Sequence, residues 1–357
     1  MYKLSILFIF IITGSFSFAQ KKADSLLLAN YRPISIYKIP KAIITTAAFS
    51  IVDMHSHDYV STPEEVDEWV KRMDRLNIQK TMILCTRDTK GFDSAVAKYS
   101  RYPKRFGLWC CFDYTGYGTP GWQKHALAEL VRCHKKGAIG VGELGDKGEG
   151  EIYSAPTPGY GLHIDDPQMK PLLEKCAELH MPVSIHVAED EWMYATPDST
   201  NDGLMNASTW HVDMNKPNKL GHDALIKTLE NAVRDNPKTT FIACHLANTC
   251  SNLKVLGDLL DKYPNLYADI AARYAEISPV PRYTAAFITK YQDRLLYGTD
   301  NSPEEKMYLA TFRILESADE HFYETDMFNY HWPLYGLNLS KGVLEKMYGK
   351  NAEKILN

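Results

Sequence analysis

From residue 48 to its C-terminus, the chain alternates between short apolar runs and stretches with apolar residues at helical spacing. The apolar runs are too uniformly hydrophobic for strands with one face in water, so they predict strands buried on both faces. Such strands separated by helices predict a parallel sheet, and eight repeats match a (β/α)8 barrel. The predicted strands span residues 48–52, 81–85, 106–112, 138–143, 182–187, 240–244, 266–270 and 294–298.

Two of the connections are long. Residues 144–166 follow the fourth strand and residues 188–222 follow the fifth, and in a barrel both would lie over the carboxyl-terminal mouth. Helices close the chain, the last over 343–356 with an interruption near Gly349. We therefore predict an α/β fold, a (β/α)8 TIM barrel with long loops after strands 4 and 5 and C-terminal helices. An open doubly wound sheet is the alternative, but no glycine-rich phosphate loop follows the first strand.

The N-terminus has the features of a signal peptide. Lys3 precedes an apolar run over residues 4–13, and Ser17 and Ala19 are small residues at the recognition positions. The run is short for a membrane span, which needs about 20 residues, so we expect cleavage after Ala19 and no membrane attachment afterwards. An uncleaved anchor is the alternative. The predicted units are a signal peptide over 1–19, a lead-in segment over 20–47 and a barrel over 48–357, in an exported protein, periplasmic or secreted.

Charge and cysteine content limit the partners. Lys and Arg total 40 against 44 Asp and Glu, a net charge of −4, so the chain lacks the basic footprint of a nucleic-acid-binding protein. A small-molecule substrate is the expected partner, and assembly into a homo-oligomer stays open. The seven cysteines include no pair with metal-binding spacing, and we expect mostly free, buried thiols.

Polar residues with metal-binding side chains stand at the ends of five predicted strands. In the sequence Asp53-Met54-His55-Ser56-His57, strand alternation would place Asp53, His55 and His57 on one face. Two neutral imidazoles so placed can bind one ion. The carboxyl ends of barrel strands meet at one mouth, so residues far apart in sequence can join them. The other candidates are Glu143, His186, His245 and Asp300, at the ends of strands four, five, six and eight.

This combination resembles the amidohydrolase superfamily, and most closely its amidohydrolase-related branch of metal-dependent TIM-barrel hydrolases. The matching marks are His-x-His on strand one, a glutamate on strand four, histidines on strands five and six, and an aspartate on strand eight. The run from Asp293 to Asp300 and the closing run from Asn351 to Leu356 resemble the C-terminal signature of that branch. The resemblance covers roughly residues 50–356.

The resemblance implies a catalytic divalent metal, one ion or two per chain. In a two-ion site the strand-one histidines and Asp300 would hold the first ion. Glu143 would bridge the ions, and His186 and His245 would hold the second. In a one-ion site His186 would join the first set, and His245 would become a catalytic residue. Zinc is the expected ion, although these ligand types also suit Mn, Fe, Co and Ni.

The implied chemistry is hydrolysis of an amide, ester or lactone by a metal-activated water. Asp300 would be catalytic, taking the proton of the water and passing it to the leaving group. The alternative is non-oxidative decarboxylation of an aromatic or unsaturated acid, because the branch includes one-metal decarboxylases. Those enzymes generally lack a strand-four ligand, so Glu143 favours hydrolysis. Glu143 has an alternative of its own, an ion pair with Lys147 or an arginine.

Substrate contacts are predicted from residues that follow strands two and seven. Arg87 and Arg273 are candidate clamps for a substrate carboxylate, with a structural ion pair as the alternative for each. Asp53 is expected to orient a histidine or to be a paired, structural carboxylate. The aromatic residues of the 188–222 insertion would wall a pocket or cover the barrel rim, and residues 189–191 are expected to form a solvated acidic turn.

Overall fold

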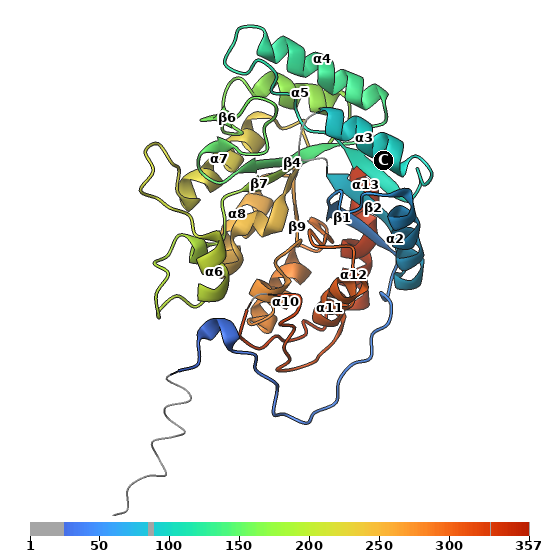
Figure 1. Cartoon of the computed structure of the whole chain (residues 1–357), viewed down its shortest axis with the longest axis vertical. Coiled ribbons are helices and arrows are strands. Elements are labelled where there is room, and N and C mark those ends of the chain that lie inside the picture. The colour runs from blue at the N-terminus through green and yellow to red at the C-terminus, as the bar shows by residue number, and fades with distance from the viewer. Residues whose placement is uncertain (1–24, 85–88, 329, 357) are drawn as a thin grey trace, which may run out of the picture.

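The computed structural model describes residues 25–84, 89–328 and 330–356. The predicted signal peptide and Arg87 lie outside the described residues. Across the described ranges, no helix is both long and apolar enough to cross a membrane. The lead-in segment starts with the 3-10 turn η1 (Leu28–Asn30) and then runs in extended form along the outside of the fold, where Ala42 N donates to Asp319 Oδ1 (Figure 1).

Eight parallel strands form the centre of the molecule. One sheet pairs the strands in the order β1-β2-β3, and the other contains β10-β9-β8-β7-β4. The predicted parallel α/β architecture is confirmed, and the strand ends differ from the predicted ones by a few residues. The eight strands are β1 (Ile51–Ser56), β2 (Ile78–Leu84), β3 (Phe106–Trp109), β4 (Val141–Asp146), β7 (Val183–Val187), β8 (Phe241–Ala243), β9 (Leu266–Asp269) and β10 (Leu295–Leu296).

Backbone hydrogen bonds join the two sheets on both sides. Between β3 and β4, Cys110 N donates to Gly140 O over 3.0 Å and Gly142 N donates to Cys110 O over 2.9 Å. Between β1 and the chain just after β10, Met54 N donates to Tyr297 O over 2.9 Å. The first and last parallel strands are thus neighbours, as a (β/α)8 barrel requires.

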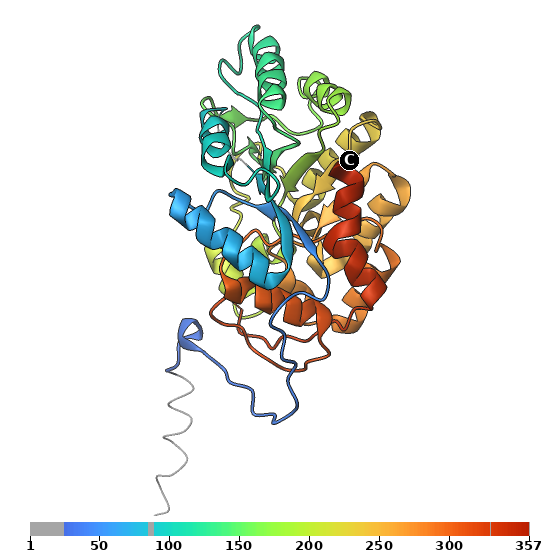
Figure 2. The same cartoon turned by 90° about the vertical axis from the view of Figure 1, so that its right-hand side faces the viewer.

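Helices surround the strands on the outside (Figures 1 and 2). The helix α2 begins where the sequence signals it, because Glu65 N donates to Thr62 Oγ1 and Thr62 N donates to Glu65 Oε2, a capping box. The surrounding helices are α2 (Pro63–Leu76), α3 (Thr89–Tyr99), α4 (Trp122–Lys135), α5 (Lys170–Glu178), α7 (His222–Asp235), α8 (Leu253–Lys262), α10 (Pro281–Lys290) and α11 (Glu305–Glu316).

Two apolar layers hold the strands in place. A small cluster, with Met54, Met82 and Trp109 among its members, fills the space between the strands, and a large one lies between strands and helices. Ala352 also belongs to the inner cluster, and Asn351 Nδ2 donates to Leu295 O over 2.8 Å. The C-terminal elements α12 (Lys341–Glu345), a π-helical turn (Lys346–Lys350) and α13 (Asn351–Leu356) therefore pack at the amino ends of the strands and leave the opposite mouth free.

The two long insertions contribute short elements at that mouth. The first carries the antiparallel hairpin β5 (Gly150–Glu151) and β6 (Gly159–Tyr160), which extends the sheet from β4. The second carries a 3-10 turn (Glu191–Met193) and α6 (Leu204–Trp210). The remaining short elements are the turns Cys244–Asn248 and Cys250–Asn252 after β8, and α9 (Tyr274–Ile277) after β9.

Candidate metal centre

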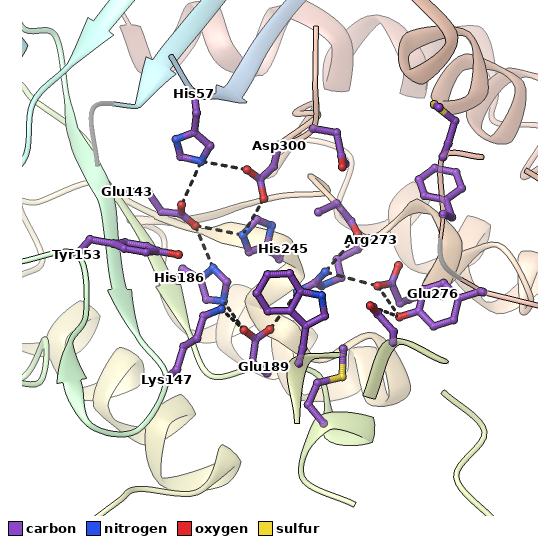
Figure 3. A pocket seen from close by; sticks show the side chains of 18 residues that line it. His57, Glu143, Lys147, Tyr153, His186, Glu189, His245, Arg273, Glu276 and Asp300 are labelled. Carbon is purple, nitrogen blue, oxygen red and sulfur yellow. Dashed lines mark hydrogen bonds and ion pairs between the residues drawn. The ribbon is translucent and has the colours of Figure 1, made fainter. Parts of the chain in front are cut away.

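The six predicted metal-binding side chains come together at the carboxyl ends of the strands. Five of them line one pocket of about 390 Å³, and Figure 3 shows these five around its floor, with dashed lines joining imidazoles to carboxylates. The sixth, His55, is fully buried behind them. His55 lies on β1, and His57 directly follows that strand. Glu143 lies on β4 and His186 on β7, while His245 and Asp300 lie in the segments that follow β8 and β10.

Glu143 stands at the middle of this group. Its Oε1 lies 3.1 Å from His186 Nδ1 and 3.1 Å from His245 Nε2. Its Oε2 lies 3.3 Å from His57 Nε2 and 3.7 Å from His55 Nε2. The alternative in which Glu143 pairs with Lys147 is wrong, because Lys147 Nζ pairs with Glu189 instead. Each oxygen of this carboxylate thus faces a different pair of imidazoles.

Asp300 forms the opposite side of the group. Its Oδ1 lies 3.0 Å from His57 Nε2, and its Oδ2 lies 3.7 Å from His245 Nε2. Its side chain is 22% exposed, so one edge of it faces the pocket. Burial raises the pKa of Asp300, but the neighbouring imidazoles outweigh burial and lower it to about 2. Asp300 is therefore a carboxylate at neutral pH.

Three imidazoles have their Nδ1 atoms occupied on the side away from the pocket. His57 Nδ1 donates to Leu84 O over 3.0 Å, and His245 Nδ1 donates to Ala271 O over 2.9 Å. A carbonyl only accepts, so these Nδ1 atoms carry a hydrogen, and each ring in its neutral form presents a lone pair at Nε2. His55 Nδ1 bonds to Asp269 Oδ2 over 2.9 Å in the same way.

In the neutral, metal-binding form of the rings these lone pairs point at carboxylate oxygens, so acceptor faces acceptor unless a proton or a cation lies between them. His55 Nε2 and His186 Nε2 are also buried with no hydrogen-bond partner among the described residues. A divalent cation between imidazole nitrogens and carboxylate oxygens resolves the first feature and gives His55 Nε2 a partner, because these are its preferred ligands. His186 faces Glu143 through Nδ1, and its Nε2 lies 3.7 Å from Glu189 Oε1. The donor set therefore fits a divalent metal. Among the six residues, three overlapping groups have ligand atoms within 4.8 Å of one another: His55, His57 and Glu143; His55, His245 and Asp300; and Glu143, His186 and His245.

A left-handed turn brings His245 into the group. The strand β8 ends one residue earlier than predicted, and His245 has a φ of 58°. The next three residues also have positive φ, which is uncommon for side chains other than glycine. Asp269 Oδ1 stabilises the turn by accepting from His245 N over 2.9 Å. The same carboxylate thus holds two of the imidazole residues, His55 through its ring and His245 through its backbone.

Asp53 does not take the position that strand alternation predicts. The pairing of β1 with β2 is irregular between Asp53 and Ser56, so the period of two is broken there. The Asp53 carboxylate accepts from Thr299 Oγ1 over 2.8 Å and from Tyr308 OH of α11 over 3.1 Å, and it bonds to no imidazole. The expectation that Asp53 shares the face of His55 is wrong. Its second expected role, a paired structural carboxylate, matches these contacts.

The acidic run over residues 189–191, expected as a solvated turn, is solvated only at Glu191. Glu189 is 4% exposed and Asp190 is fully buried, because both pair with Arg273. Arg273 Nε lies 3.0 Å from Asp190 Oδ2, and its other nitrogens contact Asn248 Oδ1 and Glu276 Oε1. Arg273 lines the pocket, but its donors are occupied by protein acceptors, which favours the structural ion pair over the substrate clamp.

The pocket also contains residues that the sequence did not single out. Tyr153 comes from the first insertion, and burial, followed by the negative charge of Glu143, raises the pKa of its phenol. Lys147 Nζ lies 5.1 Å from the ring centroid of Trp210, which lines the pocket as expected for an aromatic residue of the 188–222 insertion. No sequence pattern marks Tyr153 or Lys147 as pocket residues, because an insertion loop has no periodicity that tells which side chains turn inward. The outer wall is completed by Met193, Met327, Phe328 and Tyr330.

Comparison with known proteins agrees with this geometry. The amidohydrolase family model matches residues 52–357. This chain belongs to the amidohydrolase family. The resemblance drawn from the strand-end motifs is therefore confirmed, and the fold of this amidohydrolase is that of related TIM-barrel enzymes. No curated protein matches the sequence.

Solved structures share the fold of this amidohydrolase at low sequence identity. A 2,6-dihydroxybenzoate decarboxylase from Rhizobium is 14% identical, with a TM-score of 0.53 over 86% of this chain and 98% of that one. A putative amidohydrolase from Staphylococcus aureus is 15% identical, with a TM-score of 0.51 over 86% and 99%. A dihydroxybenzoic acid decarboxylase from Polaromonas, solved with bound manganese and 2-nitroresorcinol, is 15% identical, with a TM-score of 0.51 over 86% and 97%. The same fold thus occurs in two decarboxylases and in a putative amidohydrolase.

Proposed function

We propose that this amidohydrolase is a metal-dependent hydrolase that cleaves an amide, ester or lactone bond. The observation that supports the proposal is the position of Glu143. Its two oxygens face two separate pairs of imidazoles at 3.1–3.7 Å, which is the arrangement of a carboxylate shared by two neighbouring ions. A single ion does not need a carboxylate in that position. His55 and His57 with Asp300 would hold one ion, and His186 and His245 the other.

When bound, divalent ions supply a water that is ionised near neutral pH and polarise the carbonyl that it attacks. The residues of the chain provide the rest. Asp300 is ionised, touches the imidazole group and reaches the pocket, so it is placed to take a proton from the water and deliver it to the leaving group. The apolar and aromatic wall would hold the group attached to the scissile bond and exclude bulk water.

Non-oxidative decarboxylation is the second candidate. His55, His245 and Asp300 form a compact ligand group by themselves, so they can hold one ion without Glu143. Two of the structures with this fold are decarboxylases of dihydroxybenzoic acids. In that reaction Glu143 would only balance the charge of the histidines, and the ion count would be one.

We propose zinc as the ion, on the ligand types alone, and manganese is the alternative that the Polaromonas protein suggests. We also propose export of the protein, on the signal-like N-terminus. Mass analysis of the mature N-terminus tests the export proposal, and a start at Gln20 is the expected result.

One experiment separates the two reactions. The protein is loaded with zinc or manganese, its ions are counted by elemental analysis, and it is incubated with lactones, esters, amides and hydroxylated benzoic acids. The hydrolase proposal expects about two ions per chain and acid release from a carbonyl substrate. If the protein carries one ion and releases carbon dioxide from an aromatic acid, the hydrolase proposal is wrong and the decarboxylase proposal takes its place.

A further inference from the structure

Tyr153 presents an unused hydrogen-bond donor to the metal centre. Figure 3 shows its side chain entering the pocket from the first insertion, with the hydroxyl directed toward Glu143 and His186. The ring is half-buried, and within the described residues the hydroxyl has no hydrogen-bond partner. A phenol that faces a pocket without a protein partner is available to a bound molecule.

The chain holds this ring in a defined position. A Cβ on Gly145 would lie 2.5 Å from Tyr153 Cε2, so the ring packs directly on the backbone of β4, two residues beyond Glu143. The buried Glu151 carboxylate accepts from Tyr153 N over 2.8 Å and from Gly145 N over 3.0 Å. Ile152 N donates to Gly145 O over 2.7 Å. Tyr153 is thus attached to the strand that carries Glu143, although it belongs to a loop.

Other donors around the floor of the pocket are committed. The Nδ1 atoms of His57 and His245 donate away from the pocket, to backbone carbonyls. Arg273 is occupied by Asp190, Asn248 and Glu276. The carboxylates of the floor only accept, and a negatively charged oxygen on a substrate would be repelled by them. The six metal-binding residues therefore supply no hydrogen-bond donor that could act beside the metal on charge developing on the substrate.

We propose that Tyr153 is a catalytic residue that donates a hydrogen bond to the carbonyl oxygen of the substrate. This role rests on the proposed hydrolysis. Attack by water forms a C–O bond and moves the carbonyl π electrons onto that oxygen, where the phenol stabilises the negative charge without giving up its proton. When the carbonyl re-forms, the bond to the leaving group breaks, and the leaving group takes the proton that Asp300 removed from the water. One water is consumed, and one acid and one alcohol or amine are released.

The test compares Tyr153→Phe with Tyr160→Phe. Tyr160 is a matched control, because it belongs to the same insertion, is 69% exposed and does not line the pocket. With zinc-loaded protein and dihydrocoumarin or 4-nitrophenyl acetate, Y153F should lower kcat about 10²–10³-fold, with the bound zinc unchanged. Y160F should behave as the wild type. Wild-type kcat in Y153F overturns the proposal.

A second measurement does not depend on turnover. Phenylphosphonate presents tetrahedral, negatively charged oxygens, and its binding to zinc-loaded protein is measured by calorimetry. Y153F should bind it about tenfold more weakly than wild type and Y160F, the loss of one hydrogen bond to a charged group. Gly145→Ala, which displaces the ring, should have the same effect. Equal affinities, or no binding by any of the proteins, overturn the role of Tyr153. Lack of hydrolysis by the wild type counts against the proposed function alone.

Discussion

Replacing Asp269 with asparagine should weaken metal binding without removing a metal ligand. Asp269 Oδ2 bonds to His55 Nδ1 over 2.9 Å, while Oδ1 accepts from His245 N and Ala271 N over 2.9 and 3.0 Å. The asparagine carbonyl can keep the two backbone bonds, which leaves its NH₂ group against His55 Nδ1. Two donors cannot share that contact, so the His55 hydrogen should move to Nε2, the atom that faces the metal centre.

The size of the effect follows from the burial of both partners. His55 and Asp269 are almost fully buried, so water cannot replace the lost bond. Loss of such an outer contact typically weakens metal binding about 10–100-fold, which is about 1.4–2.8 kcal/mol. Asp269→Asn should therefore bind zinc with about 10–100-fold lower affinity than the wild type, measured by competition with a chelator.

Asp53→Asn is the matched control. Asp53 is just as buried and adjoins the same strand end, but its carboxylate bonds to Thr299 and Tyr308 and to no imidazole. Its zinc affinity should stay within about twofold of wild type, because the tautomer of His55 is unchanged. Equal zinc affinities for D269N and wild type would refute the assignment of the His55 tautomer. A loss of the same size in D53N would show that any buried charge near β1 controls binding.

Four further predictions concern single residues. Asp300→Asn should keep the fold and reduce kcat by about 10²-fold or more, since proton transfer through the carboxylate is lost, and initial rates check this. Glu143→Gln should lower the zinc count from about two per chain to about one by elemental analysis, if the carboxylate is shared. Burial raises the pKa of Glu151 to about 8, so its contribution to stability is complete below pH 4.5 and is lost as the pH rises toward 8. Glu151→Gln should therefore gain stability relative to wild type between pH 5 and pH 8 in thermal melts. Arg273→Met should lower the free energy of unfolding by about 3–5 kcal/mol in denaturant titrations, because Asp190 stays buried without its cation.

Much of the architecture and of the metal centre follows from patterns that are local in the sequence. Strand and helix signals repeat every few residues, and the parallel arrangement brings all carboxyl ends to one mouth. His186 and Asp300 are 114 residues apart in the sequence, yet this arrangement predicts that they share one pocket. Both side chains line that pocket. The ends of elements were less accurate, as at β8, where a left-handed turn replaces the last predicted strand residue.

Contacts between segments without a periodic pattern could not be predicted. Glu189 and Asp190 look like a surface turn until Arg273, which follows a different strand, supplies the charge that allows their burial. Strict alternation predicted that Asp53 and His55 point to the same face of β1. The prediction fails because an irregularity in the pairing with β2 interrupts the alternation between Asp53 and Ser56.

The fold class follows from the alternation of apolar runs with helical spacing, and the six candidate metal-binding residues follow from their places at the ends of those runs. Three features depend instead on contacts between segments that are distant in the sequence: the carboxylate that orients His55, the division of the Glu143 oxygens between imidazoles, and the entry of Tyr153 into the pocket. A strand constrains the directions of its side chains by its pleat, whereas the direction of a loop side chain depends on what it packs against. For Tyr153 that is the bare backbone of Gly145, at the end of β4.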